Sequence, residues 1–375
     1  MPSSLIDAVA AAGIPTDTPP SSLVSALATI PDPRDPRGVR YPLAEVLAVL
    51  ACAVIAGSRS FTMIAEWALD AARSRPVTTS GQVPVLSTIH RIATLVDADT
   101  VEQTLHTWIR TQVKTEAIAI DGKEVRGAKN ADGSRVFLMA AVTHDTGCVI
   151  GQEAIGEKTN EIPHFPLLLD QLGDLTGKII TADALHTQHT HATTLGDRGA
   201  HYVFTVKRNQ PTLHDRIASQ TWAPLPVQHT VREKAHGRIT TWSITCQPAQ
   251  PWVGFPGAAQ TIRLTRDHTN PRTGTTSREH VYAITSLTAR DATPERVAAL
   301  IRGHWCIENR LHWVRDVTYD EDRSQIRTRN GPRTMAALRN LAISIHRLHG
   351  ATNIAKATRT AMRDPELARQ LLTRL

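Results

Sequence analysis

The sequence predicts an α/β protein: a mixed sheet with helices on its faces, an all-α region before it, an all-β segment that interrupts it, and a basic helical end. Three observations support this. Helical spacing of apolar residues gives way to strand-like alternation at about residue 115. Short strands and helices then alternate up to residue 210. Residues 323–375 hold eleven Lys and Arg against two Asp and Glu, a net charge of +9.

Composition sets the class of protein. The chain has 375 residues, of which 41% are hydrophobic and 21% charged, which is enough for two or three folded domains. The longest apolar run, Val46–Gly57, is shorter than the roughly 20 residues that a membrane-spanning helix needs. The N-terminus lacks the positive charge of a secretory signal, and the four cysteines form no CxxC pair. We expect a soluble, cytoplasmic protein.

The distribution of charge indicates a partner. The whole chain carries +7, but residues 1–110 are net −2, so the positive charge is concentrated in residues 323–375. A concentrated basic segment suits a polyanion, most simply nucleic acid. The alternative is a solvated helical surface without a partner.

The first part of the chain is predicted to be helical. Residues 1–22 are expected to be a poorly ordered leader, and residues 23–110 an all-α domain. Its helices are Leu43–Ala56, Phe61–Ala72, one capped by Ser87 and one capped by Asp99 or Thr100. The helix–break–helix around Ser80–Leu95 fits either a DNA-reading helix-turn-helix or a plain helical bundle.

A mixed sheet is predicted over residues 111–210, to be completed by residues 294–322. The order β-β-β-α-β-α-β is that of the ribonuclease H fold. The strands and helices are expected at Glu116–Ile120, Val136–Thr143, Val149–Ile155, Pro163–Leu172, Gly177–Asp183, His189–Arg198 and His201–Lys207.

Residues 211–293 read as an all-β insertion, with strands at Ile239–Cys246, Thr261–Thr265 and Val281–Ser286 between loops rich in Pro, Gly and Thr. A helix is predicted from Glu295 to about Val317. The basic tail, 323–375, is expected to contain helices near Met335–Leu348 and Asp364–Leu372.

Two acids stand at strand ends. Asp121 and Asp183 each follow an apolar strand, and if these strands are neighbours, both carboxylates project from one edge of the sheet. Carboxylates held close repel unless cations neutralise them, and oxygen ligands without thiolates favour Mg²⁺ or Mn²⁺. Two such ions about 4 Å apart can activate an attacking oxygen and stabilise a leaving one at phosphorus.

A third acid is expected on the helix after the insertion. We favour Glu308, because it lies on the helical stripe of Trp305, Leu311 and His312, where an unpaired charge facing a core would be costly. The two tryptophans, Trp305 and Trp313, are expected in the core. A zinc site made by His304, Glu308 and His312 is disfavoured, because no HExxH motif is present. The other candidates are Asp316, with Asp320, Glu321 and Asp322 in an expected solvated loop.

Three ordered stretches resemble a known family: AIAIDGKEVRGAK at Ala117–Lys129, ITADALHTQ at Ile180–Gln188 and RGHWCIENRLHWVRDVTYDEDRSQIR at Arg302–Arg327. They are similar to the DDE transposases of bacterial insertion sequences, specifically the ISAs1 group of the IS4-like class. The likeness covers roughly residues 25–350, and the PDPRDPRGVRYPL segment resembles that group's associated N-terminal domain. It implies a ribonuclease H-like fold with a β insertion, and Asp121, Asp183 and Glu308 as metal-binding catalytic acids.

The resemblance also implies a function: cleavage of insertion-sequence ends and joining of the 3′-hydroxyl to target DNA, with Mg²⁺ or substituting Mn²⁺. The partners would be both DNAs, in a homodimer or larger synaptic complex near the bacterial nucleoid. A nuclease without strand transfer and a non-catalytic DNA-binding descendant are the alternatives. Where the wider IS4-like pattern has Tyr, Arg and Lys, this sequence has Ile301, His304 and Arg315. The cations expected to contact DNA are Lys123, Lys207, Arg208, Arg302, Arg310, Arg315 and Arg327.

Overall fold

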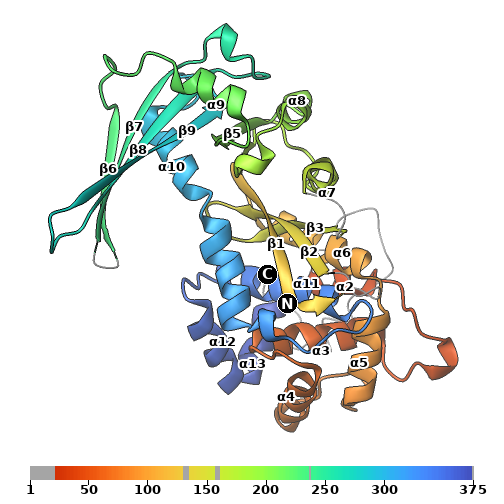
Figure 1. Cartoon of the computed structure of the whole chain (residues 1–375). Helices are drawn as coiled ribbons and strands as arrows, with labels where there is room; N and C mark the ends of the chain where they lie inside the picture. Colours follow the sequence, from red (N-terminus) through yellow and green to blue (C-terminus); the bar gives the residue numbers. More distant parts are fainter. Residues whose placement is uncertain (1–21, 130–134, 157–160, 236–237, 374–375) are drawn as a thin grey trace. The chain divides into compact units, whose positions relative to one another are not determined.

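The computed structural model describes residues 22–129, 135–156, 161–235 and 238–373, and the chain forms two compact units. Unit 1 holds residues 1–114, 122–161 and 307–375, and unit 2 holds residues 115–121 and 162–306. The predicted leader lies outside the described residues, apart from Ser22. The fold is mixed α/β, with parallel and antiparallel strand pairs (Figure 1). Within the described residues no helix is long and apolar enough to cross a bilayer.

The N-terminal part of unit 1 is helical, as predicted. Three of its helices begin at a side-chain cap: Ser22 accepts from the Ser25 amide, Ser60 from the Met63 amide and Asp97 from the Thr100 amide. The cap of the last helix therefore lies two residues before the expected Asp99, and Ser87 lies inside a helix that begins at Leu86. The helices are α2 (Leu23–Ala28), α3 (Leu43–Ile55), α4 (Phe61–Ser74), α5 (Leu86–Leu95) and α6 (Ala98–Gln112).

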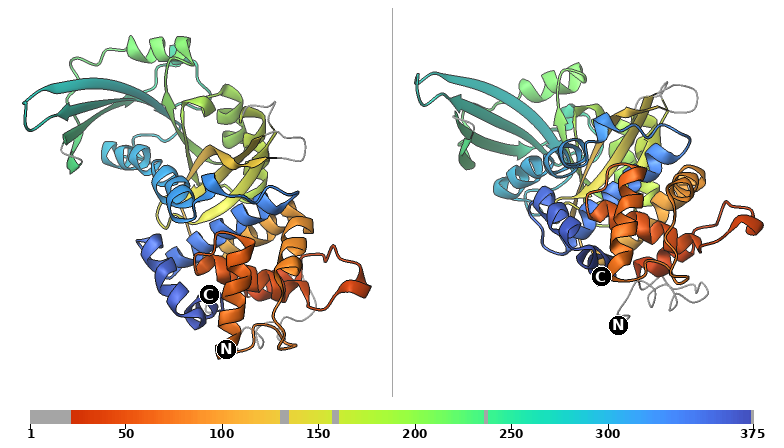
Figure 2. Two further views of the ribbon diagram at one scale, coloured as in Figure 1. Left: turned by 60° about the horizontal axis from the view of Figure 1, so that its bottom comes forward. Right: turned by 90° about the horizontal axis from the view of Figure 1, so that it is seen from below.

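The C-terminal helices pack into unit 1, and the first of them is part of its interior. They are α11 (Gly331–Leu348), α12 (Ile354–Arg363) and α13 (Pro365–Thr373), and they lie beside the N-terminal helices (Figure 2). Every residue from Thr334 to His346 is buried, and α11 packs against α3 and α6. Helix α3 is apolar on nearly all sides, as expected for a buried helix, whereas α11 also buries polar residues such as Arg339 and Asn340, which have hydrogen-bond partners. The helices of the expected tail are present, but α11 is part of the core and not a free basic surface.

Unit 1 also contains an antiparallel pair. β2 (Arg135–Thr143) pairs with β3 (Val149–Ile155), and β2 lies between β3 and β1 (Ala117–Lys129) in the strand order. The turn between β2 and β3 contains Gly147 at φ 75°, a conformation that favours glycine. Helices α6 and α11 pack on β3, so the strands are covered by helices from both ends of the chain.

Unit 2 has a parallel centre. The first residues of β1 pair in parallel with β4 (Ile179–Ala182), and β4 pairs in parallel with β5 (His201–Val206). The connections carry α7 (Phe165–Gln171) and α8 (His189–Asp197), which is the predicted alternation of strand and helix. The residues of β4 are all buried, as expected for a strand covered on both faces.

The segment after β5 extends the same row of strands. Helix α9 (Pro211–Ala218) comes first, so residues 211–293 are not all strand. The strands that follow are antiparallel, and β9 pairs with β5. Helix α10 (Pro294–Gly303) packs on them, with Val297 and Leu300 in a shared apolar core (Figure 1). The strands are β6 (His229–Ala235), β7 (Arg238–Pro248), β8 (Gln260–Thr269) and β9 (Thr276–Thr285).

The helix expected from Glu295 to Val317 is interrupted. Regular α-helix ends at Gly303, and two π-helical turns follow at Glu308–His312 and Val314–Thr318. Wide π turns are rare and occur frequently at functional sites, because they change where side chains point along a helix. This helical segment carries Glu308.

Candidate active site

Asp121 and Asp183 lie at the same level, just past the paired residues of two adjacent parallel strands, although β1 itself continues beyond Asp121 to Lys129. The register pairs Ile120 with Ala182, and each acid is the next residue of its strand or loop. Because the two strands run in parallel, both acids stand at the same edge of the unit 2 sheet. The expected neighbourhood of these two strands is therefore confirmed. Both acids are half-buried, so their carboxylates are within reach of solvent.

The loop after Asp183 is held in place by hydrogen bonds. The Asp183 carboxylate accepts from the Leu185 amide at 2.9 Å and caps a short 3₁₀ turn. Asn209 donates to the Ala184 carbonyl at 2.6 Å, and the Thr187 hydroxyl donates to the Thr205 carbonyl at 2.6 Å. These bonds tie the turn to the end of β5. The exposed Lys207 and Arg208 follow β5 at that edge, as predicted for phosphate contacts.

His304 contacts the strand that leads to Asp183. Its Nδ1 lies 3.3 Å from the Thr181 hydroxyl, two residues before the acid. Arg302, just before it, pairs with Glu233 of β6. Unit 2 therefore packs the end of the α10 segment over β4, and Glu308 follows four residues further along the chain.

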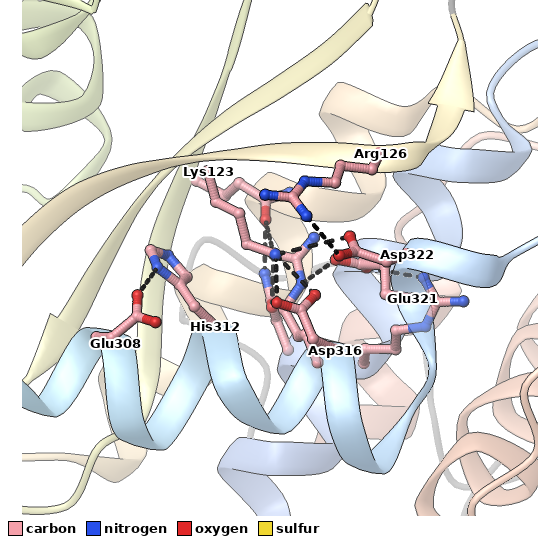
Figure 3. A network of polar contacts seen from close by, with 11 residues as sticks. Lys123, Arg126, Glu308, His312, Asp316, Glu321 and Asp322 are labelled. Atoms are coloured by element: carbon pink, nitrogen blue, oxygen red, sulfur yellow. Dashed lines mark hydrogen bonds and ion pairs between the residues drawn. The ribbon is translucent and has the colours of Figure 1, made fainter.

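Glu308 and His312 form a pair on the π-helical segment. The Nδ1 atom of His312 lies 3.2 Å from Oε2 of Glu308 (Figure 3). The Glu308 side chain is 55% exposed, whereas that of His312 is 5% exposed. The hydrogen bond from His312 lowers the pKa of Glu308; partial burial opposes it, and the charges of His312 and Lys123 add to it. Glu308 is therefore an ionised, accessible carboxylate at neutral pH.

The stripe on which Glu308 was expected does not face the core as a whole. Leu311 and His312 are buried, but Trp305 is 55% and Trp313 is 53% exposed. The expectation of two core tryptophans is therefore wrong. The prediction assumes 3.6 residues per turn throughout, whereas the π turns that follow Trp305 change the spacing at which side chains return to the same face of the helix.

The other candidates for the third acid are held by cations. Asp316 pairs with Lys123, and Asp322 with Lys123 and Arg126 (Figure 3). Asp320 pairs with Arg59. The fourth, Glu321, is fully buried between Arg315 and Arg339, so the expected solvated loop at 320–322 is wrong. A buried carboxylate needs a partner, and the two arginines supply it. Glu308 differs because its partner in the described structure is a histidine.

Four of the cations expected to contact DNA have partners within the protein. Arg315 is 1% exposed and donates to Glu321, so its guanidinium is not offered to a phosphate. Arg310 donates to the Asp145 carbonyl, Lys123 pairs with Asp316, and Arg302 pairs with Glu233. The exposed ones are Lys207, Arg208 and Arg327.

Sequence reasoning missed two features. The Glu308–His312 pair has i, i+4 spacing and was considered only as part of a zinc site. The partner of Lys123 carries no local signal, because Lys123 and Asp316 are 193 residues apart in sequence. Asp121 and Asp183 would offer carboxylate oxygens, which Mg²⁺ and Mn²⁺ prefer, whereas the Glu308–His312 pair offers an oxygen and an imidazole nitrogen, a set that zinc also accepts.

Comparison with known proteins decides the family. Residues 94–345 match the family described as "Transposase DDE domain", and residues 24–109 match the one described as "DDE_Tnp_1-associated". The chain belongs to the DDE transposase family. It is 30% identical over 349 residues to "Putative transposase YncI" of Escherichia coli O157:H7, covering 87% of each chain. It is 29% identical to "H repeat-associated putative transposase YhhI" of Escherichia coli strain K12, over 86% of this transposase and 89% of that protein.

A solved structure also aligns with this transposase. A chain of the piggyBac transposase synaptic complex with hairpin DNA covers 92% of it, and 77% of that chain is covered, with a TM-score of 0.41 and 11% sequence identity. The family matches include Asp121, Asp183 and Glu308, all within residues 94–345.

Proposed function

We propose that this transposase cuts the ends of an insertion sequence and joins the exposed 3′-hydroxyl to target DNA, with Asp121, Asp183 and Glu308 as its catalytic acids. The observation that carries the proposal is the register of β1 and β4, whose last pair, Ile120 with Ala182, is followed by Asp121 in one chain segment and Asp183 in the other. Glu308 is chosen as the third acid because its side chain is 55% exposed and its partner in the described structure is a histidine, whereas Asp316, Glu321 and Asp322 pair with lysine or arginine.

The proposed fold is ribonuclease H-like, and the proposed group is ISAs1 of the IS4-like class. The order β1–β2–β3–α7–β4–α8–β5 supports the fold, with β2 and β3 antiparallel and β4 and β5 parallel. In this proposal residues 23–110 form the associated helical domain, and residues 111–210 with 294–322 form the catalytic domain. Residues 211–293 form the insertion, and residues 323–375 supply basic helices. A dimer or larger complex near the nucleoid follows from the need to cut two ends together.

The acids fit Mg²⁺, with Mn²⁺ as a substitute. When bound, such ions would lower the pKa of an attacking water and stabilise the leaving oxygen at phosphorus. The contributions of the chain itself are separate. Glu308 supplies a charged carboxylate that His312 orients through its Nδ1 contact. Asp183 is oriented by the Leu185 amide. Lys207 and Arg208, at the carboxyl end of β5, would bind the DNA backbone.

The test uses the full chain and labelled DNA that carries the inverted repeats flanking the gene. Asp121→Asn, Asp183→Asn and Glu308→Gln should each reduce cleavage and joining at least about 100-fold, as expected for loss of a group that stabilises charge in the transition state. DNA affinity should stay within about twofold, measured by fluorescence anisotropy. Asp320→Asn is the matched control, an acid nearby that is 37% exposed and paired with Arg59.

The outcomes separate the alternatives. Cleavage without joining of the 3′-end to a plasmid target would favour a nuclease. Binding without cleavage in the wild type would favour a non-catalytic DNA-binding protein. Full activity in Glu308→Gln would show that the third acid is another residue.

A further inference from the structure

The helical segment that carries Glu308 is tied to strand β1 by an ion cluster. The Nζ atom of Lys123 lies 2.6 Å from Oδ1 and 2.7 Å from Oδ2 of Asp316, and 3.9 Å from Oδ1 of Asp322. Arg126 is three residues further along β1, and its Nη1 atom lies 3.8 Å from Oδ2 of Asp322 (Figure 3). We call Lys123, Asp316 and Asp322 the Lys123 cluster. It joins strand β1 to the helical segment through Asp316 and to the turn after that segment through Asp322.

A second cluster lies beside the first. Glu321 accepts from Arg315 Nε at 2.8 Å and from Arg339 Nη1 at 2.8 Å. The three side chains are at most 2% exposed. We call Arg315, Glu321 and Arg339 the Glu321 cluster. Arg315 and Asp316 are adjacent in the helical segment, and Glu321 and Asp322 are adjacent in the turn. Each of the two clusters therefore links the helical segment to the turn that follows it.

The backbone of β1 also touches this turn. A Cβ atom at Gly127 would lie 2.6 Å from the Glu321 carbonyl oxygen and 3.0 Å from the Asp322 carbonyl oxygen. Only glycine allows this approach without movement of the backbone. The turn itself begins at Asp320, whose φ of 53° is uncommon for a residue with a side chain. Strand and turn are therefore in direct contact, and side-chain charges are added to that contact.

We propose that Lys123 is a positioning residue, which holds the π-helical segment Glu308–Thr318 against β1 and so determines where Glu308 presents its carboxylate. The inference rests on the proposed role of Glu308. It assigns Lys123 a role other than a DNA contact. The Lys123 side chain is 11% exposed and already shared by two carboxylates, so a phosphate would have to displace an existing ion pair.

Direct contact between Lys123 and DNA predicts a different pattern of variants. Loss of a phosphate contact weakens DNA binding, and loss of the neighbouring Asp316 charge would strengthen it, because repulsion falls. Loss of a positioning ion pair has the same effect whichever partner is removed. Removing Asp316 as well as Lys123 adds little to removing Lys123 alone, because the interaction between the two is already lost. The two roles are therefore distinguished by a double-mutant cycle.

The experiment compares Lys123→Met, Asp316→Asn and the double variant in the full chain, with Lys123→Arg as the conservative variant. The matched control is Glu124→Gln, which breaks a pair between Glu124 of the same strand and Arg135, whose side chain is 62% exposed. Three quantities are measured: the cleavage rate on labelled end DNA, the Mg²⁺ concentration for half-maximal cleavage, and DNA affinity. Hydrogen exchange of the backbone amides of residues 307–318 is measured on the protein without DNA.

We expect each single variant to cut at least tenfold more slowly and to need about tenfold more Mg²⁺, with DNA affinity within twofold of the wild type. The double variant should match the single ones, Lys123→Arg should recover part of the rate, and Glu124→Gln should behave as the wild type. Hydrogen exchange should become faster in the single variants. Weaker DNA binding in Lys123→Met alone, or additive losses in the double variant, would overturn the proposal.

The exchange measurement separates this proposal from the proposed function. If exchange at residues 307–318 rises in Lys123→Met and Asp316→Asn while Glu308→Gln retains full activity, the clusters hold the segment but Glu308 is not the third acid. If exchange is unchanged in both single variants, the positioning role fails even when Glu308 proves essential.

Discussion

Replacing Glu321 by glutamine should destabilise unit 1 strongly although the new side chain has nearly the same shape. The Glu321 carboxylate is fully buried, and the two guanidinium groups that it pairs with, Arg315 and Arg339, are 1–2% exposed. The variant leaves both cations buried without a counter-charge. Breaking a buried ion pair by removing one partner typically costs about 3–5 kcal/mol.

The pKa of Glu321 gives a second measure of the same interaction. Burial by itself would raise this pKa, but the charges of Arg315 and Arg339 outweigh burial and lower it from the ordinary 4.5 to about 2. A difference of that size corresponds to roughly 3 kcal/mol between the charged and neutral forms. The agreement with the cost of a broken ion pair makes about 3 kcal/mol the expected loss, a large part of the 5–15 kcal/mol that stabilises a typical domain.

The same shift predicts a pH dependence. The pKa of Glu321 is lower in the folded than in the unfolded protein, so its contribution is complete above about pH 4.5 and is lost as the pH falls toward 2. The difference in unfolding free energy between wild type and Glu321→Gln should therefore be constant from pH 5 to 7. Below that window it should shrink, because the wild-type carboxylate becomes protonated.

Urea unfolding followed by circular dichroism measures both effects. Glu124→Gln breaks the pair between Glu124 of β1 and the exposed Arg135 of β2. It should change the unfolding free energy by less than about 0.5 kcal/mol. Replacing all three members of the Glu321 cluster by apolar residues of similar size should recover much of the loss, because no charge remains buried. A loss below about 1 kcal/mol in Glu321→Gln at pH 7 would refute the reasoning.

Three further predictions concern metal, DNA and acid. Cleavage should require Mg²⁺ or Mn²⁺ and should stop in EDTA. Ca²⁺ should support DNA binding with little cleavage, because its longer bonds do not align the in-line attack. Activity that follows the amount of bound zinc would instead identify His304, Glu308 and His312 as the site. Because α11 lies in the core, the proposed DNA contact of residues 323–375 is tested on the exposed face of α12. Replacing Lys356, Arg359 and Arg363 by Gln should reduce the slope of log affinity against log salt by up to about 0.9 per lost phosphate contact. An unchanged slope would show that this face does not contact DNA. Burial, with the charge of Arg110, lowers the pKa of His106 in the folded protein from 6.5 to about 3. The unfolded protein therefore gains a proton that the folded protein does not, and the unfolding free energy falls by about 2 kcal/mol between neutral pH and pH 5. His106→Leu should remove this loss, and equal acid sensitivity of the two proteins would contradict it.

The sequence alone determined the order of elements and the position of two acids. Each apolar run of β1 and β4 stops at an aspartate, and β4 does end just before Asp183, whereas the strand end predicted at Asp121 is wrong, because β1 continues to Lys129. The family motifs lie in the same short stretches. The signal was strong because each inference used residues within one element.

Tertiary structure alone decided which charges are available. Net charge predicted a basic tail and several DNA-binding arginines, because Lys and Arg are mostly exposed. The structure instead buries Arg315, Arg339 and Arg369, and their partners come from distant parts of the chain: Arg315 reaches Gln152, and Arg369 donates to the Ala71 carbonyl. Composition records that a charge exists, but its exposure depends on partners that only folding brings within hydrogen-bond distance.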